Sequence, residues 1–349
     1  MPAVEVALST PRQRLLAAFE YEHPHRIPVV YHPSTAGLHV HGQKLLDLLR
    51  RFPPDNPIRF EGLPAPPPGT TDADGRYHEF RRDGWGVEWE YRIFGIAGHP
   101  SRYPFASWRE GRDYEFPPVP EPGSEAEAER AADVARQQQT WLVFDGGVSL
   151  FERLHAVRPL DDVLIAMGSG DEDFLAFLAR LVAYWHRVLD HCLAVGSDVI
   201  TFGDDWGTQR GPMVSPALFR SLVKPRYAEL MERVHGAGRR VFLHCCGDVG
   251  PLLDEFFDLG IDGYWPQITC YDAEALAQRC CQRRVAMYIH PDRQRLIPLG
   301  TPAEIDAYVR SFAERHRRLG GGGIFYVEME NDVPFDNAQA LLEAVDRYR

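Results

Sequence analysis

The sequence has little that would favour a membrane protein or a nucleic-acid-binding protein. None of its apolar runs approaches the roughly 18 residues that a membrane-spanning helix needs, and its N-terminus has no apolar leader core. Acidic residues outnumber basic ones, giving a formal net charge of -12, whereas phosphate binding requires a clustered basic face. We therefore expect neither a membrane nor a nucleic acid as a partner.

Cysteines are also few. The chain has six, four of them in the adjacent pairs Cys245–Cys246 and Cys280–Cys281. Adjacent pairs in a long chain without a leader do not resemble a disulfide framework, so we predict a reduced, cytoplasmic protein. No glycine fingerprint for a dinucleotide follows any apolar run, which disfavours a Rossmann-type cofactor domain.

What the sequence does contain is a regular alternation of short apolar runs and helical stretches. Such alternation is typical of parallel strands covered on both faces. We predict an α/β fold, a (β/α)8 TIM barrel with an N-terminal elaboration, in one domain over residues 1–349; an open doubly wound sheet is the alternative. The strand-length runs are Arg26–Tyr31, Trp141–Phe144, Asp198–Phe202, Arg240–His244, Gly263–Trp265, Val285–Ile289 and Ile324–Val327.

The region at about 53–122 departs from this rhythm. It is rich in proline and glycine and lacks a long helical period, so we predict an irregular insertion on the barrel. The segment Gly84–Gly95 alternates in the manner of a hairpin. Because seven runs leave the barrel one strand short, we expect the eighth strand to lie within this insertion.

Polar side chains collect just past five successive predicted strands. Active sites of such barrels lie at the carboxyl ends of the strands, so these positions are candidate site residues. Read from pattern alone, an aspartate there can also cap a helix, and a single histidine is a weak signal. The strand-end residues are Asp204, Asp205, His244, Cys246, Gln267, His290, Glu328 and Glu330.

The strongest of these signals is His244-Cys245-Cys246-Gly247. Side chains alternate along a strand, so His244 and Cys246 face one side and Cys245 faces the other. An imidazole and a thiolate so placed are suitable zinc ligands, although a site needs a third or fourth ligand. The alternative is that both cysteines are small buried hydrophobic residues.

Several segments resemble the uroporphyrinogen-decarboxylase-like superfamily, in the expected order and over nearly the whole chain. They are RLLAAFEYEHPHRIPV, DGWGVEW, Asp198–Gly250, GIDGYWPQ, PDRQRLIPLGTPAEI and DVPFDNAQALLEAV. This resemblance implies a (β/α)8 barrel. True decarboxylases of the family carry an N-terminal arginine motif that holds the substrate carboxylates. The corresponding stretch here, Tyr31–Gly37, has no arginine, which argues against porphyrinogen decarboxylation.

The resemblance points instead to the cobalamin-dependent methyltransferase branch. Its members carry a zinc-binding His-x-Cys motif, matched here by His244 and Cys246. Thiol-methylating members have a further cysteine on the last strand, but this chain has none after Cys281 and offers Glu328 and Glu330 there. A His/Cys/Glu set is chemically reasonable for zinc. It favours a methyl donor of the oxygen or nitrogen type over a thiol acceptor of the coenzyme-M type.

We therefore hypothesise a zinc-dependent methyltransferase that moves a methyl group from a small O-methyl donor, such as a methoxylated aromatic compound, to a corrinoid on a partner protein. The alternatives are a metal-independent decarboxylase or lyase with Asp205 as its polar catalyst, and a barrel that has become a binding subunit. The oligomeric state stays open, a homodimer included. The predicted roles are metal binding by His244, Cys246 and Glu328 (with Glu330, His290 or Asp205 as other choices for the third ligand), catalysis by Asp205 and His290, and substrate contact by Asp204, Gln267, Trp85 and Trp89.

Overall fold

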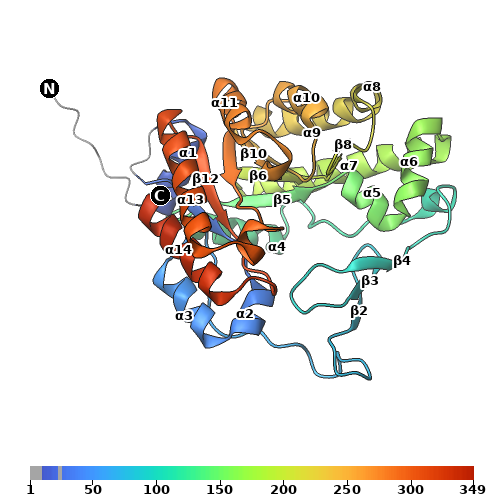
Figure 1. Ribbon diagram of the computed structural model, residues 1–349. Coiled ribbons are helices and arrows are strands. Elements are labelled where there is room, and N and C mark those ends of the chain that lie inside the picture. Colours follow the sequence, from blue (N-terminus) through green and yellow to red (C-terminus); the bar gives the residue numbers. More distant parts are fainter. Residues whose placement is uncertain (1–9, 23–25) are drawn as a thin grey trace. The chain divides into compact units, whose positions relative to one another are not determined.

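The computed structural model describes residues 10–22 and 26–349 (Figure 1). The chain divides into two compact units. Unit 1 comprises residues 1–65, 136–142 and 262–349, and unit 2 comprises residues 66–135 and 143–261. The first nine residues, where the sequence lacks an apolar leader core, lie outside the described part. No helix of the described residues combines the length and the apolar character needed to cross a membrane.

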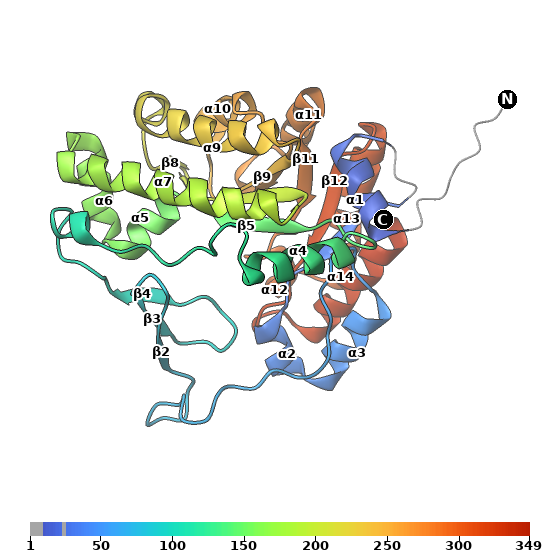
Figure 2. The same ribbon diagram turned by 180° about the vertical axis from the view of Figure 1, so that it is seen from behind.

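Unit 1 is built on four parallel strands in the order β1-β12-β11-β10. Every residue of β11 and β12 is buried, as expected for strands covered on both faces. Helices α13 and α14 lie side by side (Figure 2), and α13 begins with a capping box between Thr301 and Glu304. The elements of unit 1 are α1 (Pro11–Phe19), β1 (Val29–Tyr31), α2 (Thr35–His41), α3 (Gln43–Arg51), β10 (Gly263–Pro266), α11 (Ala273–Arg283), β11 (Ala286–Ile289), α12 (Leu296–Leu299), α13 (Pro302–Arg318), β12 (Gly323–Val327) and α14 (Phe335–Tyr348).

Unit 2 contains three parallel strands in the order β5-β6-β9 and an antiparallel sheet in the order β2-β3-β4. Its longest helix, α7, starts where the Asp171 carboxylate accepts a hydrogen bond from the Phe174 amide. The elements are β2 (Glu79–Arg82), β3 (Glu88–Tyr91), β4 (His99–Arg102), β5 (Phe144–Val148), α5 (Phe151–Val157), α6 (Leu160–Ser169), α7 (Glu172–Ala194), β6 (Val199–Gly203), β7 (Gly207–Thr208), β8 (Gly211–Pro212), α8 (Pro216–Leu218), α9 (Lys224–Gly236), β9 (Arg240–Cys245) and α10 (Leu253–Asp258), with α4 (Glu125–Gln137) ending at the boundary of the units.

All seven predicted parallel strands are present, but one is shifted. The apolar run Trp141–Phe144 predicted a strand that in fact starts at Phe144 and continues to Val148. Its second half contains Gly146, at a φ of 98°, where the pairing with β6 shifts register. A β-bulge often contains glycine in place of an apolar residue. The apolar pattern therefore ends at the bulge although the strand continues.

One prediction for residues 53–122 is wrong. The strands described in this region, β2, β3 and β4, form an antiparallel sheet of their own, so the eighth parallel strand is not among them. The hairpin predicted at Gly84–Gly95 is present: its turn is at 83–87, and its second strand, β3, lies within that segment. Asp83 fixes that turn, because its Oδ1 accepts hydrogen bonds from the amides of Trp85 and Val87.

Candidate metal centre

Strands β6 and β9 bring three of the predicted site residues to one edge of unit 2. The two strands run parallel, with Gly203 opposite His244. Asp205 therefore follows β6 at the level where Cys246 follows β9. The polar residues thus lie at the carboxyl ends of the strands, as the sequence predicted.

Asp205, His244 and Cys246 form a compact trio whose ligand atoms all lie within 4.8 Å of one another. His244 Nε2 is 3.4 Å from Cys246 Sγ and 3.4 Å from Asp205 Oδ1. Tetrahedral zinc with bonds of about 2.0 Å to nitrogen and about 2.3 Å to sulfur separates those ligands by about 3.5 Å. The two distances from His244 thus suit a small tetrahedral cation, and the carboxylate and thiol lie within 4.8 Å of each other.

The backbone holds the trio in place through two glycines. Gly247 has a φ of 79°, and a Cβ there would lie 2.2 Å from the carbonyl carbon of Gly207. The Asp248 amide donates to the Thr208 carbonyl at 2.7 Å, and the Cys246 amide donates to Asp205 Oδ1 at 2.7 Å. The loop after β6 and the loop after β9 are thereby joined, so Asp205 is fixed beside Cys246 without a ligand.

Cys245 faces the opposite side of β9, as strand alternation predicted. It is fully buried, and its Sγ accepts a hydrogen bond from the Trp206 amide at 3.3 Å. Burial raises the pKa of this thiol well above its ordinary value. Cys245 is therefore a structural thiol, whereas Cys246 is half-buried.

Asp204 is buried and helps to begin helix α5. Its carboxylate accepts hydrogen bonds from the Leu150 amide at 2.8 Å, the Glu152 amide at 2.7 Å and the Ser149 hydroxyl at 3.0 Å. The Tyr227 hydroxyl also donates to it. Burial raises the pKa of Asp204 to about 7, although hydrogen bonds from Tyr227, Glu152 and Leu150 oppose that shift. Its contacts match the capping interpretation; the predicted substrate contact stays a prediction.

Unit 1 gathers a second charged cluster around Glu328, which follows β12. Glu328 Oε2 accepts a hydrogen bond from Arg293 Nη1 at 3.0 Å, and Arg293 Nη2 lies 3.3 Å from Glu330 Oε1. Two histidines complete the cluster, with His32 Nδ1 3.3 Å and His290 Nε2 3.5 Å from the Glu328 carboxylate. Burial raises the pKa of Glu328 and of Glu330 and lowers the pKa of His32. Both predicted carboxylates therefore have a cation from their own chain.

The Trp265 indole sets the tautomer of His290. Its Nε1–H donates to His290 Nδ1 at 3.2 Å, so the neutral ring carries its proton on Nε2, which faces Glu328. Gln267, after β10, contacts Thr269 and Gln294 at 3.5 and 3.4 Å. The catalytic role predicted for His290 and the substrate contact predicted for Gln267 stay predictions.

The two tryptophans predicted to contact substrate belong to packed surroundings in unit 2. Trp85 is 9% exposed and packs edge-on against Phe116 and Tyr184. Trp89 donates from its indole nitrogen to Asp83 Oδ2 at 2.9 Å. Trp85 is thus mainly a core residue, with Arg153 stacked over its ring at 4.1 Å.

Sequence reasoning missed four polar residues near these clusters. Glu152 Oε1 accepts a hydrogen bond from the Asp205 amide at 3.3 Å, and Arg153 is the next residue of α5. Both follow β5, and the strand-end rule would have found them had that strand been placed correctly. His32 directly follows β1 and would have been found by the same rule. Arg293 lies three residues beyond His290, too far from the end of β11 for the rule to find it.

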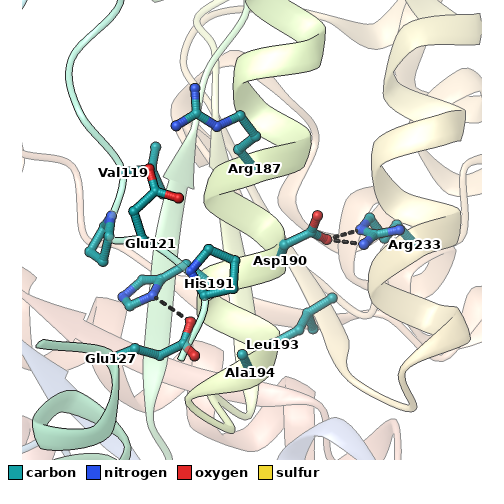
Figure 3. A pocket seen from close by; sticks show the side chains of 11 residues that line it. Val119, Glu121, Glu127, Arg187, Asp190, His191, Leu193, Ala194 and Arg233 are labelled. Atoms are coloured by element: carbon teal, nitrogen blue, oxygen red, sulfur yellow. Dashed lines mark hydrogen bonds and ion pairs between the residues drawn. The ribbon is translucent and has the colours of Figure 1, made fainter. Parts of the chain in front are cut away.

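Figure 3 shows a separate hollow beside α7, with a volume of about 350 Å³. Its charged side chains are partly paired, Glu127 with His191 at 3.3 Å and Asp190 with Arg233. It has an apolar wall from Leu193 and Ala194 and from the chain at 119–122. The hollow contains no carboxylate, histidine or cysteine of the strand-end clusters.

The fold and the trio define an α/β protein with a candidate metal site at its strand ends. Residues 155–348, more than half of the chain, match the family model of uroporphyrinogen decarboxylase (URO-D). The chain belongs to the URO-D family and is an enzyme of that superfamily. The comparison with curated proteins gave no match.

Solved structures support the fold. A methyltransferase from Methanosarcina mazei matches over 97% of this chain and 99% of its own, with a TM-score of 0.62 and 17% identity. A likeness at that identity concerns the fold. A glycosylated endo-β-1,4-xylanase from Gloeophyllum trabeum matches over 65% of this chain and 82% of its own, with a TM-score of 0.41 and 11% identity, which is too low to carry an argument.

Proposed function

We propose that this protein is a zinc-dependent methyltransferase on a (β/α)8 barrel, and that it transfers a methyl group from a small O-methyl donor to a corrinoid on a partner protein. The trio of Asp205, His244 and Cys246 carries this proposal. It brings one nitrogen, one sulfur and one oxygen ligand within 4.8 Å of one another, and these are ligand types that zinc takes. Family membership and the fold shared with a methyltransferase add support.

The chemistry of the donor set fits zinc. A thiolate, a carboxylate and a neutral imidazole together carry two negative charges, which balance a divalent cation. Three protein ligands leave a fourth position for substrate, as in catalytic zinc sites. When bound, zinc would act as a Lewis acid on the donor oxygen, and the corrinoid would accept the methyl group.

The chain's own residues prepare this site. Asp205 is oriented by the Cys246 amide, and its own amide is held by Glu152. Such hydrogen bonds around a ligand fix its orientation before the metal arrives. Asp205 therefore takes the place of third ligand in this proposal. Glu328, which the sequence suggested for that role, has Arg293, His290 and His32 as its described neighbours.

Metal content of the purified enzyme tests the proposal. We expect near-stoichiometric zinc in the wild type and its loss in Cys246→Ser and His244→Ala. Cys281→Ser is the matched control, because Cys281 is also half-buried but lies on α11 of unit 1. Wild-type protein prepared without chelators that contains no metal would overturn the proposal and favour a metal-independent decarboxylase or lyase. So would full zinc retention in both variants.

Turnover is the second test. With zinc present, the wild-type enzyme should demethylate methoxylated compounds only when a corrinoid protein is added, and His244→Ala should reduce the rate at least about 100-fold. Demethylation that proceeds at the wild-type rate in His244→Ala would exclude the mechanism.

A further inference from the structure

Arg153, in the first turn of α5, has side-chain hydrogen-bond donors that no acceptor of the described residues satisfies. Its side chain is 22% exposed, and its Nε and Nη1 atoms are buried without a hydrogen-bond partner. Among residues 10–22 and 26–349, its guanidinium contacts the Trp85 ring at 4.1 Å and lies 3.8 Å from Asp83 Oδ2. A buried charged donor without an acceptor is destabilising.

Asp83 does not satisfy this guanidinium. Its Oδ1 is occupied by the amides of Trp85 and Val87, at 2.9 and 3.0 Å, and its Oδ2 accepts from the Trp89 indole at 2.9 Å. The carboxylate is thus held by its own turn, and 3.8 Å is beyond hydrogen-bond distance. Asp83 offsets the charge of Arg153 but leaves its donors unpaired.

The chemistry of the missing partner follows from the shape of the donor group. A guanidinium is planar and offers a fork of N–H groups that matches the two oxygens of a carboxylate. Trp85 covers one face of the group and Nε and Nη1 are buried, so a ligand would meet the guanidinium at Nη2. Burial lowers the pKa of Arg153, but an arginine stays protonated in proteins.

Arg153 also lies beside the residues that support the trio. The side chain of the preceding residue, Glu152, accepts a hydrogen bond from the Asp205 amide. The Glu152 amide in turn donates a hydrogen bond to the Asp204 carboxylate. The helix turn that bears Arg153 is therefore fixed to the loop that carries a candidate metal ligand. We propose that Arg153 binds a carboxylate group of the small substrate. That the ligand is the substrate rests on the proposed function; that the site binds a carboxylate does not.

Isothermal titration calorimetry with acetate, butyrate and benzoate tests the proposal on the full-length protein. At least one carboxylate should bind, and its uncharged amide should bind at least tenfold more weakly. Arg153→Gln should weaken carboxylate binding at least tenfold, and Arg153→Lys should have a smaller effect because it keeps the charge and loses the fork. Arg81→Gln is the control, because Arg81 also stacks on an aromatic ring, Tyr91 at 3.8 Å, but is 54% exposed.

The outcomes separate this proposal from the proposed function. If no carboxylate of the panel binds the wild type, or if Arg153→Lys and Arg153→Gln both bind as the wild type does, Arg153 has no such role. If Arg153→Gln does not fold, Arg153→Lys alone decides. Arg153-dependent binding to a protein that contains no zinc would support the carboxylate site and reject the zinc-dependent methyltransferase.

Discussion

In unit 1, Glu328 and Glu330 follow a buried strand and share Arg293 as a cation. In unit 2, Asp205 also follows a buried strand, but among the described residues its basic neighbour is His244, and no arginine or lysine pairs with it. The two clusters contain similar residue types at equivalent positions. They differ in whether the chain supplies the positive charge. A carboxylate that already has an arginine gains less from a metal than one placed beside an imidazole and a thiol.

The largest expected effect concerns the identity of the third ligand. Asp205→Asn removes a carboxylate from the trio and should weaken zinc binding at least about 100-fold, whereas Glu328→Gln should change it by less than about threefold. Competition with a chromogenic chelator at fixed pH measures both affinities. A loss of similar size in Glu328→Gln would restore Glu328 as a ligand and end the distinction between the clusters.

A second prediction uses the glycines that position each strand-end loop. A Cβ at Gly247 would lie 2.2 Å from Gly207, and one at Gly37 would lie 2.4 Å from the Met329 carbonyl oxygen. Alanine at either position should therefore lower the free energy of unfolding by about 2–3 kcal/mol, measured by urea denaturation.

The two glycine variants should differ in metal binding. Gly247→Ala displaces the loop of Cys246 and should also weaken zinc binding, whereas Gly37→Ala acts on the loop before Glu330 and should leave zinc affinity unchanged. Equal zinc affinities in the two variants would show that the contact between the glycines does not position the trio.

Much of the site could be predicted because strands have a short, regular period. Alternation along β9 separated Cys245 from His244 and Cys246 without any tertiary information. The strand-end rule then found Asp205 and Glu328, because the carboxyl ends of parallel strands carry the site. These inferences needed only the positions of apolar runs, which the sequence shows directly.

The remaining features depend on contacts between distant segments. Asp205 and Glu328 are equivalent as patterns. The pairing of β6 with β9, together with the close approach of Gly207 to Gly247, places Asp205 beside Cys246. The bulge at Gly146 interrupts the apolar pattern of β5 and so hid Glu152 and Arg153. The unpaired donors of Arg153 depend on the hydrogen bonds that Asp83 accepts within its own turn and from Trp89, which no sequence pattern shows.

The units also contain buried ionisable groups with opposite effects on stability. In unit 1, burial lowers the pKa of His316 from 6.5 to about 4, so its contribution is present above pH 6.5 and is lost as the pH falls towards 4. Between pH 7 and pH 5 the loss should be about 2 kcal/mol. In unit 2, Asp204, with its pKa raised to about 7, should stabilise the fold below pH 3.8 and lose that contribution as the pH rises through 7.

Denaturation curves at several pH values test the effect of His316. Because Asp204 acts in the opposite direction over the same pH range, the test compares each variant with the wild type: from pH 7 to pH 5, His316→Leu should gain about 2 kcal/mol relative to the wild type. His186→Gln, a control at a partly exposed histidine, should keep a constant difference from the wild type. A difference between His316→Leu and the wild type that does not change with pH would show that His316 does not titrate on unfolding.

The smallest effect tests whether Arg293 balances the carboxylates of unit 1. Arg293 is 53% exposed and Glu328 is 9% exposed, so the pair is partly screened and its loss should cost only about 1 kcal/mol. Arg293→Gln leaves a buried carboxylate without its cation and should destabilise the wild-type background by that amount. On a Glu328→Gln background the same change should cost less, because only Glu330 then remains for Arg293 to balance. Additive effects in this double-mutant cycle would mean that Arg293 and Glu328 are not coupled. The unit 1 carboxylates would then not be balanced by an arginine, and this difference could not explain why Asp205 of unit 2, and not Glu328, is the metal ligand.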